Sequence, residues 1–208
     1  MPDVEATPRL IAVHEPRAPA GVVLVLHGGA SRSHQMMVSP TQLSVVRMIP
    51  TARRVAREGR RRLAVYRLLN SYRGWDSVHT PVHDVAWAID QVQQQHDDLP
   101  VGLVGHSLGG RAALLAGDQP AVRSVVALNP WVYPHDDADL TGRQVLVVHG
   151  DADRVAPIAR ARAVAERIAR RTSLEFHTVP GGKHAMLRHG TSFDGRAATF
   201  TAAALLGE

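Results

Sequence analysis

The sequence has 208 residues but no cysteine, and its only lysine is Lys183. The lack of cysteine excludes a disulfide framework and a thiolate metal site. No apolar run approaches the roughly 18 residues that a membrane-spanning helix needs. The first residues, from Met1 to Glu5, lack the basic and apolar regions of a secretory signal. We therefore expect a cytoplasmic protein with no membrane span.

Aromatic residues are also scarce, at 4% of the chain, whereas arginine is abundant and the formal net charge is +5 at pH 7. One dense basic cluster consists of Arg53, Arg54, Arg57, Arg60, Arg61 and Arg62. It can be interpreted as a nucleic-acid patch or as the solvated face of a helix and turn. A patch that stacks bases needs aromatic residues between the arginines, and this stretch has none. We favour the solvated face and predict no nucleic-acid partner.

Apolar residues make up 45% of the sequence, and the length suits one domain that buries roughly 70% of its unfolded surface. Uninterrupted apolar runs alternate with stretches of helical spacing. This alternation predicts a doubly wound α/β domain with a mostly parallel sheet flanked by helices. We expect a single domain over residues 1–208, with 1–8 as a loose tail. Strands are expected at 10–13, 22–26, 63–69, 101–104, 122–128, 143–148 and 174–179.

Helices are expected at 51–58, 159–169 and 195–206, and another begins near position 80. Gly59 is expected to end the first of these as a C-terminal glycine cap. Thr80 followed by Pro81 is the pattern of an N-cap and a first helical residue. The residues after Pro81 then form a mostly apolar stripe at helical spacing.

A buried strand runs directly into the motif Gly105-His106-Ser107-Leu108-Gly109, and helix-forming residues follow it. Gly-x-Ser-x-Gly between a strand and a helix is the nucleophile elbow of acyl-transfer enzymes. The turn must hold Ser107 in a strained backbone conformation. A side chain at position 105 or 109 would collide with the neighbouring strand or helix. The Leu108 N–H, at the positive end of the helix, is placed to stabilise an oxyanion.

Two phosphate-binding interpretations of the same glycines fail. The spacing G-x-x-x-x-G is present from Gly105, but Arg111 and Ala112 follow where a Walker loop needs Lys and Ser/Thr. The dinucleotide pattern G-x-G-x-x-G is absent. A strand–helix turn with an idle serine therefore remains the alternative to a catalytic Ser107.

Further polar residues follow the ends of later strands, where the sites of parallel sheets lie. A serine nucleophile needs a base, and the base needs an acid that orients it. His184, in a glycine-rich loop after the last strand, is a candidate base. Asp153 and Asp151 are rival acids, because Asp151 can instead bond the backbone of its own turn.

Other histidines give no spacing that suggests a metal site, so we predict no metal and no cofactor. His27, His106 and His149 each stand beside a glycine at a strand end. We expect them to support loop geometry.

These motifs together resemble the α/β-hydrolase superfamily, and most closely its small lidless esterases and dienelactone-hydrolase-like members. The family order of nucleophile, acid and base is Ser, Asp, His. The family's acid loop matches positions 149–157 and selects Asp153 over Asp151, and its histidine loop matches 180–184. Its oxyanion loop matches His27 and Gly28, so the Gly29 N–H would act beside the Leu108 N–H. The resemblance extends from about residue 10 to the end of the chain.

The resemblance implies a serine hydrolase that cleaves carboxylic esters or thioesters through an acyl-enzyme, with Ser107, Asp153 and His184 as catalytic residues. Two alternatives stay open. One is an acyltransferase that uses the same residues, and the other is a non-catalytic ligand-binding protein with the same fold.

The substrate pocket is less well defined by the sequence. Segment 129–141 is too short for the lid domain that many relatives insert after this strand. The aromatic residues Trp75, Trp131 and Tyr133 are expected near the catalytic edge, where they line an acyl or alcohol pocket or shield the sheet. Arg32 either meets an anionic substrate or stays at the surface.

Overall fold

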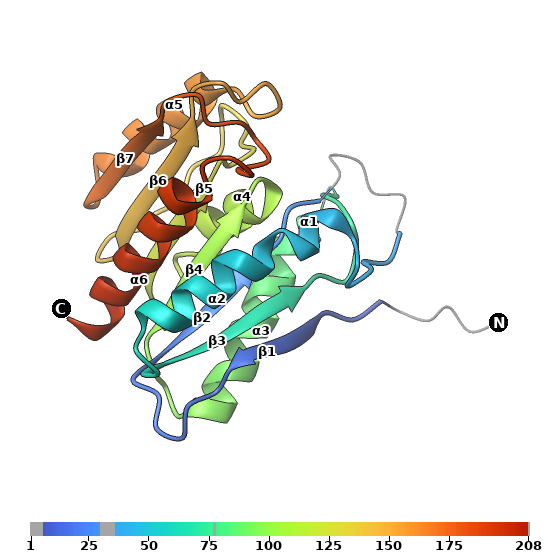
Figure 1. The fold of residues 1–208 in the computed structure, drawn as a ribbon, viewed down its shortest axis with the longest axis vertical. Helices are drawn as coiled ribbons and strands as arrows, with labels where there is room; N and C mark the ends of the chain where they lie inside the picture. The colour runs from blue at the N-terminus through green and yellow to red at the C-terminus, as the bar shows by residue number, and fades with distance from the viewer. Residues whose placement is uncertain (1–5, 30–35, 77, 208) are drawn as a thin grey trace.

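The computed structural model describes residues 6–29, 36–76 and 78–207. These residues form a seven-stranded sheet in the order β1-β3-β2-β4-β5-β6-β7 (Figure 1). All neighbouring strands pair in parallel except β1, which lies antiparallel to β3 at one edge. The strands are β1 (Arg9–His14), β2 (Gly21–Leu26), β3 (Leu63–Leu69), β4 (Val101–His106), β5 (Val122–Leu128), β6 (Gln144–Gly150) and β7 (Leu174–Val179).

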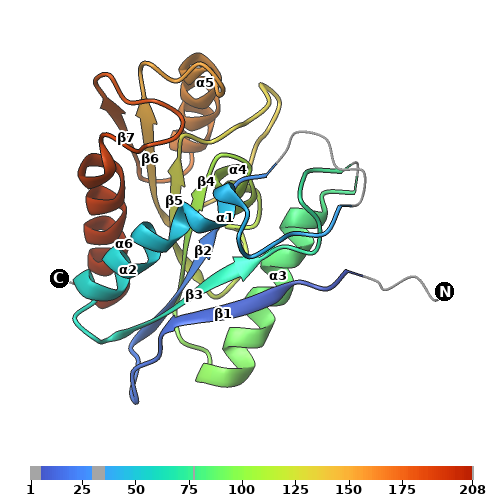
Figure 2. The ribbon, with the colours of Figure 1, turned by 45° about the vertical axis from the view of Figure 1, so that its right-hand side comes forward.

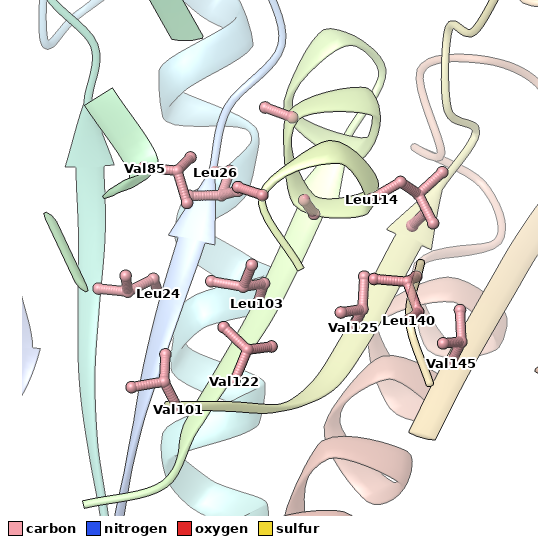
Figure 3. Packing of buried hydrophobic residues seen from close by; sticks show 14 of the residues in the cluster. Leu24, Leu26, Val85, Val101, Leu103, Leu114, Val122, Val125, Leu140 and Val145 are labelled. Atoms are coloured by element: carbon pink, nitrogen blue, oxygen red, sulfur yellow. The ribbon is translucent and has the colours of Figure 1, made fainter. Parts of the chain in front are cut away.

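The central strands are apolar on both faces because helices cover both sides of the sheet. In β2, Val22, Leu24 and Leu26 pack into one apolar cluster, whereas Val23 and Val25 pack into a second cluster on the opposite face. Figure 3 shows the first cluster, in which side chains of β2, β4 and β5 meet those of the helices. Continuous burial explains why these strands appear in the sequence as uninterrupted apolar runs.

The helices divide between the two faces as a doubly wound fold requires. Helices α3 (Thr80–His96), α4 (Leu108–Leu115) and α5 (Ile158–Ala169) contribute to the first cluster. Helices α2 (Met48–Glu58) and α6 (Arg196–Leu206) contribute to the second and lie on the opposite side (Figure 2). A short helix α1 (Leu43–Val46) precedes α2, and one π-helical turn, η1 (Thr191–Gly195), precedes α6. The predicted α/β architecture is confirmed.

No helix in the described ranges combines the length and apolarity needed to cross a membrane. Residues 1–5 of the expected tail lie outside the described residues. The basic cluster lies on α2 and the turn after it, where Arg53, Arg57 and Arg61 are exposed. Their exposure agrees with a solvated helix face.

Helix α2 ends at Glu58 with Gly59 as its C-cap residue, as predicted, but its start and the conformation of the cap differ. The helix begins at Met48, three residues earlier than expected. Pro50 is tolerated because it lies in the first turn, where its missing N–H has no intrahelical partner to lose. Gly59 does not adopt the left-handed conformation, since its φ is −67°. A Cβ at Gly59 would lie 2.8 Å from the Leu63 Cγ, so close packing requires the glycine.

The start of α3 also differs from the prediction. Thr80 is the first helical residue, and His79 occupies the N-cap position in a left-handed conformation. The Asp76 carboxylate accepts hydrogen bonds from the Thr80 N–H, at 2.8 Å, and from the Thr80 hydroxyl. An acidic group from the preceding loop therefore stabilises the positive end of the helix.

Candidate active site

Ser107 lies in the sharp turn between β4 and α4, with φ 56° and ψ −119°. The two motif glycines make this turn possible. A Cβ at Gly105 would lie 2.1 Å from the Gly109 carbonyl oxygen, and a Cβ at Gly109 would lie 2.5 Å from the His27 carbonyl oxygen. Both distances are far below van der Waals contact. The predicted steric role of the glycines is confirmed, because one clashes with the helix and the other with the neighbouring strand.

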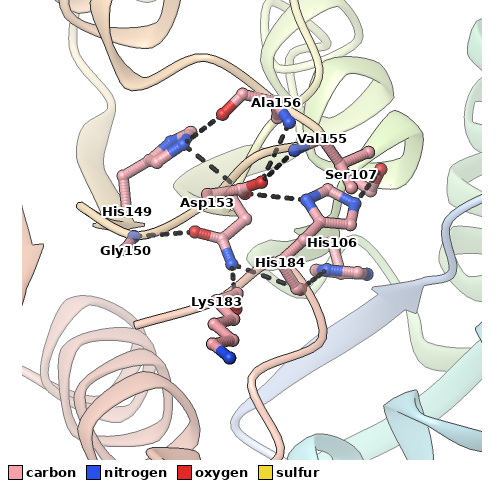
Figure 4. Close-up of polar contacts among 10 residues, drawn as sticks. His106, Ser107, His149, Gly150, Asp153, Val155, Ala156, Lys183 and His184 are labelled. Carbon is pink, nitrogen blue, oxygen red and sulfur yellow. Dashed lines mark hydrogen bonds and ion pairs between the residues drawn. The ribbon is translucent and has the colours of Figure 1, made fainter. Parts of the chain in front are cut away.

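A continuous hydrogen-bonded chain links Ser107 to the predicted base and acid (Figure 4). The Ser107 hydroxyl lies 2.9 Å from His184 Nε2. On the other side of the ring, His184 Nδ1 donates to Asp153 Oδ2 at 2.7 Å. The three side chains come from the ends of β4, β6 and β7 and meet at the carboxyl edge of the sheet. In this geometry a neutral imidazole can accept the serine proton on Nε2 while Nδ1–H stays bonded to the carboxylate.

Asp153 is held so that only one of its oxygens faces the imidazole. Its Oδ1 accepts hydrogen bonds from the backbone N–H groups of Val155, at 2.8 Å, and Ala156, at 2.9 Å. Burial alone would raise the pKa of Asp153. The hydrogen bonds from His184 and from these two N–H groups outweigh that effect and hold its pKa below the ordinary value. The carboxylate therefore remains ionised at neutral pH.

Asp151, the rival acid, has a different partner. Its Oδ1 accepts a hydrogen bond from the Gly181 N–H at 2.7 Å. This contact joins the acid loop after β6 to the loop that carries His184. Asp151 therefore accepts a hydrogen bond from backbone, as the alternative to a catalytic role predicted. The N–H group belongs to the neighbouring loop rather than to the turn of Asp151 itself.

Two of the histidines beside glycines hold loop backbone in place. His149 Nε2–H donates to the Ala156 carbonyl at 3.0 Å, and burial lowers the pKa of His149. His27 Nδ1–H donates to the Gly28 carbonyl at 2.5 Å, and its Nε2 accepts the Asn70 N–H at 3.2 Å. These contacts fix the acid loop and join the ends of β2 and β3.

His106 contacts His184, the candidate catalytic base, directly. Its Nε2–H donates to the His184 carbonyl at 2.8 Å, and the centroids of the two rings lie 4.9 Å apart. Complete burial lowers the pKa of His106 from 6.5 to about 3. The ring therefore stays neutral under ordinary conditions and acts as a fixed donor beneath the His184 loop.

The burial of neutral His106 predicts a loss of stability in mild acid. Between pH 6.5 and about 3 the unfolded chain binds a proton that the folded chain excludes, so the free energy of unfolding falls as the pH drops below 6.5. At pH 5 this group should account for about 2 kcal/mol of lost stability relative to pH 7.5. Urea unfolding of the wild type and His106→Gln at both pH values measures the difference. Equal losses in the two proteins would contradict the prediction.

The predicted oxyanion donors are the N–H groups of Gly29 and Leu108. Leu108 begins α4, where the first N–H groups have no intrahelical acceptor. Gly29 follows β2 and packs so tightly that a Cβ there would lie 2.1 Å from the Arg73 carbonyl oxygen. Both residues line the same cavity as Ser107. Their role as an oxyanion hole remains a prediction.

Ser107 and His184 open into a cavity of about 400 Å³. Its other described lining residues include Gly28, Gly29, Ser44, Arg47, Leu108, Trp131, Val155 and Ala185. Trp131 thus lies where the sequence predicted a pocket residue, whereas Arg32 lies outside the described residues. Within the described parts of the chain, no cluster of three or more His, Asp or Glu side chains is placed to hold a metal ion.

A sequence model of the alpha/beta hydrolase family matches residues 79–204, which is more than half of the chain. This protein belongs to the alpha/beta hydrolase family. The match includes the serine, the aspartate and the histidine of the hydrogen-bonded chain. Family and fold together support a hydrolase. No curated protein matched the sequence.

Solved structures share the alpha/beta hydrolase fold at low sequence identity. A serine hydrolase homologue from Coxiella burnetii is 19% identical, with a TM-score of 0.70, and the match covers 92% of this chain and 90% of the other. A serine hydrolase without a lid from Xanthomonas campestris is 19% identical, with a TM-score of 0.65 and coverages of 91% and 85%. A dienelactone hydrolase from Anabaena variabilis is 20% identical, with a TM-score of 0.61 and coverages of 97% and 98%.

In this alpha/beta hydrolase, two of the three predicted pocket aromatics, Trp75 and Tyr133, pack against a buried arginine. Arg111, on α4, is buried and forms a two-pronged ion pair with Asp136 at 2.7 and 2.8 Å. Its guanidinium lies 4.0 Å from the Trp75 ring centroid and 4.6 Å from that of Tyr133. Trp75 and Tyr133 are absent from the described cavity lining. They instead hold the short segment after β5 against α4.

Asn129 is a positioning residue that the sequence analysis did not identify. It is fully buried at the end of β5, with φ 42°. Its Nδ2 donates to the carbonyls of Lys183, at 3.1 Å, and His184, at 3.3 Å, while its Oδ1 accepts the Gly150 N–H at 2.8 Å. The signal available in the sequence was a polar residue directly after the apolar run 125–128 and directly before a proline.

Replacing Asn129 with alanine should affect both stability and catalysis. Three backbone groups would lose a partner, although the His184 carbonyl keeps His106, so the free energy of unfolding should fall by about 2–3 kcal/mol. The loosened loop should also lower kcat for an ester substrate by roughly 10- to 100-fold, because small displacements of a base are costly. Urea unfolding and steady-state kinetics on the same preparation test both effects. A destabilised variant with wild-type kcat would show that Asn129 acts on the fold alone.

Proposed function

We propose that this protein is a serine hydrolase that cleaves carboxylic esters or thioesters through an acyl-enzyme on Ser107. The hydrogen-bonded chain from Ser107 through His184 to Asp153 is the observation that supports this proposal most directly. A serine hydroxyl is a weak nucleophile unless a neighbouring base takes its proton. Action on a small-molecule substrate in the cytoplasm belongs to the same proposal.

The reaction proceeds in two halves. His184 Nε2 takes the Ser107 proton as Oγ attacks the carbonyl carbon, and the N–H groups of Gly29 and Leu108 stabilise the resulting oxyanion. His184 then gives the proton to the departing alcohol or thiol, which leaves an acyl-Ser107. In the second half His184 activates water, the acid is released, and the serine is regenerated. Asp153 remains ionised throughout and stabilises the imidazolium.

A panel of aryl esters and thioesters with increasing acyl length tests this function. The expected result is turnover of at least one acyl length, with an initial burst of aryl alcohol or thiol wherever deacylation is the slower step. The burst amplitude should match the concentration of protein. The proposal would be contradicted if, for every ester and thioester of the panel, the wild type released the alcohol or thiol no faster than Ser107→Ala does.

A further inference from the structure

One wall of the cavity beside Ser107 carries an arginine that the reaction above does not use. Arg47 joins α1 to α2, and Ser44, one helical turn earlier, lines the same wall. Both α1 and α2 belong to the segment that follows the predicted oxyanion loop. Arg47 therefore shares a cavity with the nucleophile without belonging to the Ser107–His184–Asp153 chain.

The Arg47 side chain has an unsatisfied donor. Its Nη1 is buried, and no group in the described part of the protein accepts a hydrogen bond from it. Asp194, the acidic residue that stabilises its charge, already accepts a hydrogen bond from the Thr51 hydroxyl at 2.7 Å. Burying an arginine N–H without an acceptor is unfavourable. Because Nη1 has almost no accessible surface, a ligand in the cavity would bind the part of the Arg47 side chain that lines it.

The charge of the cavity selects the kind of acceptor. None of the described lining residues carries a carboxylate, and Arg47 is the permanent cation among them. His106, also in the lining, is neutral because burial lowers its pKa. A single guanidinium suits a singly charged, planar oxyanion, since its fork of N–H groups matches the two oxygens of a carboxylate.

We propose that Arg47 binds a free carboxylate of the substrate, which makes the preferred substrate an ester that carries a second, ionised carboxyl group. This inference rests on the proposed hydrolase function and adds the substrate class to it. The carboxylate belongs either to the acyl part or to the alcohol part of the ester, and the experiment below distinguishes the two.

Matched ester pairs that differ in one charge test the proposal. The first pair is 4-acetoxybenzoate and its methyl ester, with the charge in the leaving group. The second is mono-4-nitrophenyl adipate and its methyl ester, with the charge in the acyl group. For at least one pair, the ratio of kcat/KM for the charged over the neutral ester should fall by about 10- to 100-fold from wild type to Arg47→Met. Comparing ratios between proteins cancels the intrinsic reactivity of each ester.

Two further variants separate charge recognition from folding. Arg47→Lys keeps the positive charge but loses the fork, so it should retain part of the preference. Arg57→Met removes the same charge from an exposed position on α2 and should keep the wild-type ratio. An unchanged ratio in Arg47→Met for both pairs would overturn the proposal.

A binding measurement makes the result independent of turnover. In Ser107→Ala, benzoate and adipate titrated calorimetrically should bind, and the double variant with Arg47→Met should bind neither. If the wild type hydrolyses none of the esters, the proposed hydrolase function is rejected. Carboxylate binding that depends on Arg47 would still support the binding site. Binding that is absent, or equal with and without Arg47, would overturn it.

Discussion

Ser107→Ala is expected to lower kcat for ester hydrolysis by about 10⁶-fold, the scale seen when a serine protease loses its nucleophile. The loss is this large because no other group at the elbow can form the acyl bond. Alanine can occupy the same turn, so the melting temperature should change little. The measurement is initial-rate kinetics on protein of verified mass and purity.

A second serine provides the matched control for that variant. Ser124 lies fully buried on β5, and its hydroxyl has no hydrogen-bond partner in the described structure. Ser124→Ala removes the same atom from the same sheet and should keep wild-type kcat. Residual activity of Ser107→Ala close to that of Ser124→Ala would show that another residue carries the reaction.

Asp153→Asn is expected to lower kcat by about 10⁴-fold at neutral pH, although the side chains have the same shape. The backbone N–H groups of Val155 and Ala156 require an acceptor, so the asparagine oxygen must face them. Its NH₂ group then faces His184 Nδ1, which can no longer carry a proton. The proton moves to Nε2, and the imidazole cannot accept the one on Ser107. Steady-state kinetics at saturating ester measures the effect.

Asp151→Asn is the control, because Asp151 and Asp153 were rival candidates for the acid that orients His184. The asparagine oxygen can still accept the Gly181 N–H, so the loop contact survives. This variant should keep kcat close to the wild-type value. A large loss in Asp151→Asn with a small loss in Asp153→Asn would reverse the assignment of the acid.

The parts of the fold that sequence predicted well are those governed by local rules. Strands covered on both faces need uninterrupted apolar runs, and β2 satisfies this requirement in every residue. The elbow at Ser107 needs glycines two residues to either side, because a Cβ at Gly105 or Gly109 would overlap backbone atoms. Motif order then placed Asp153 and His184 at the ends of the correct strands.

The features that sequence missed depend on contacts between distant segments. Asn129 acts on a loop more than 50 positions later in the chain, and nothing near it in the sequence indicates that partner. The contacts of Arg111 with the rings of Trp75 and Tyr133 likewise join three separate segments. The position of these aromatic residues near the catalytic edge predicted that they line a pocket. Trp75 and Tyr133 instead pack against the buried guanidinium of Arg111.

The most direct test of the catalytic role of Ser107 is the site of covalent labelling by a fluorophosphonate. We expect one adduct per protein molecule, located by peptide mass mapping on Ser107. It should be absent in Ser107→Ala and form much more slowly in Asp153→Asn. An adduct on another residue, or undiminished labelling of Ser107→Ala, would contradict the catalytic role of Ser107.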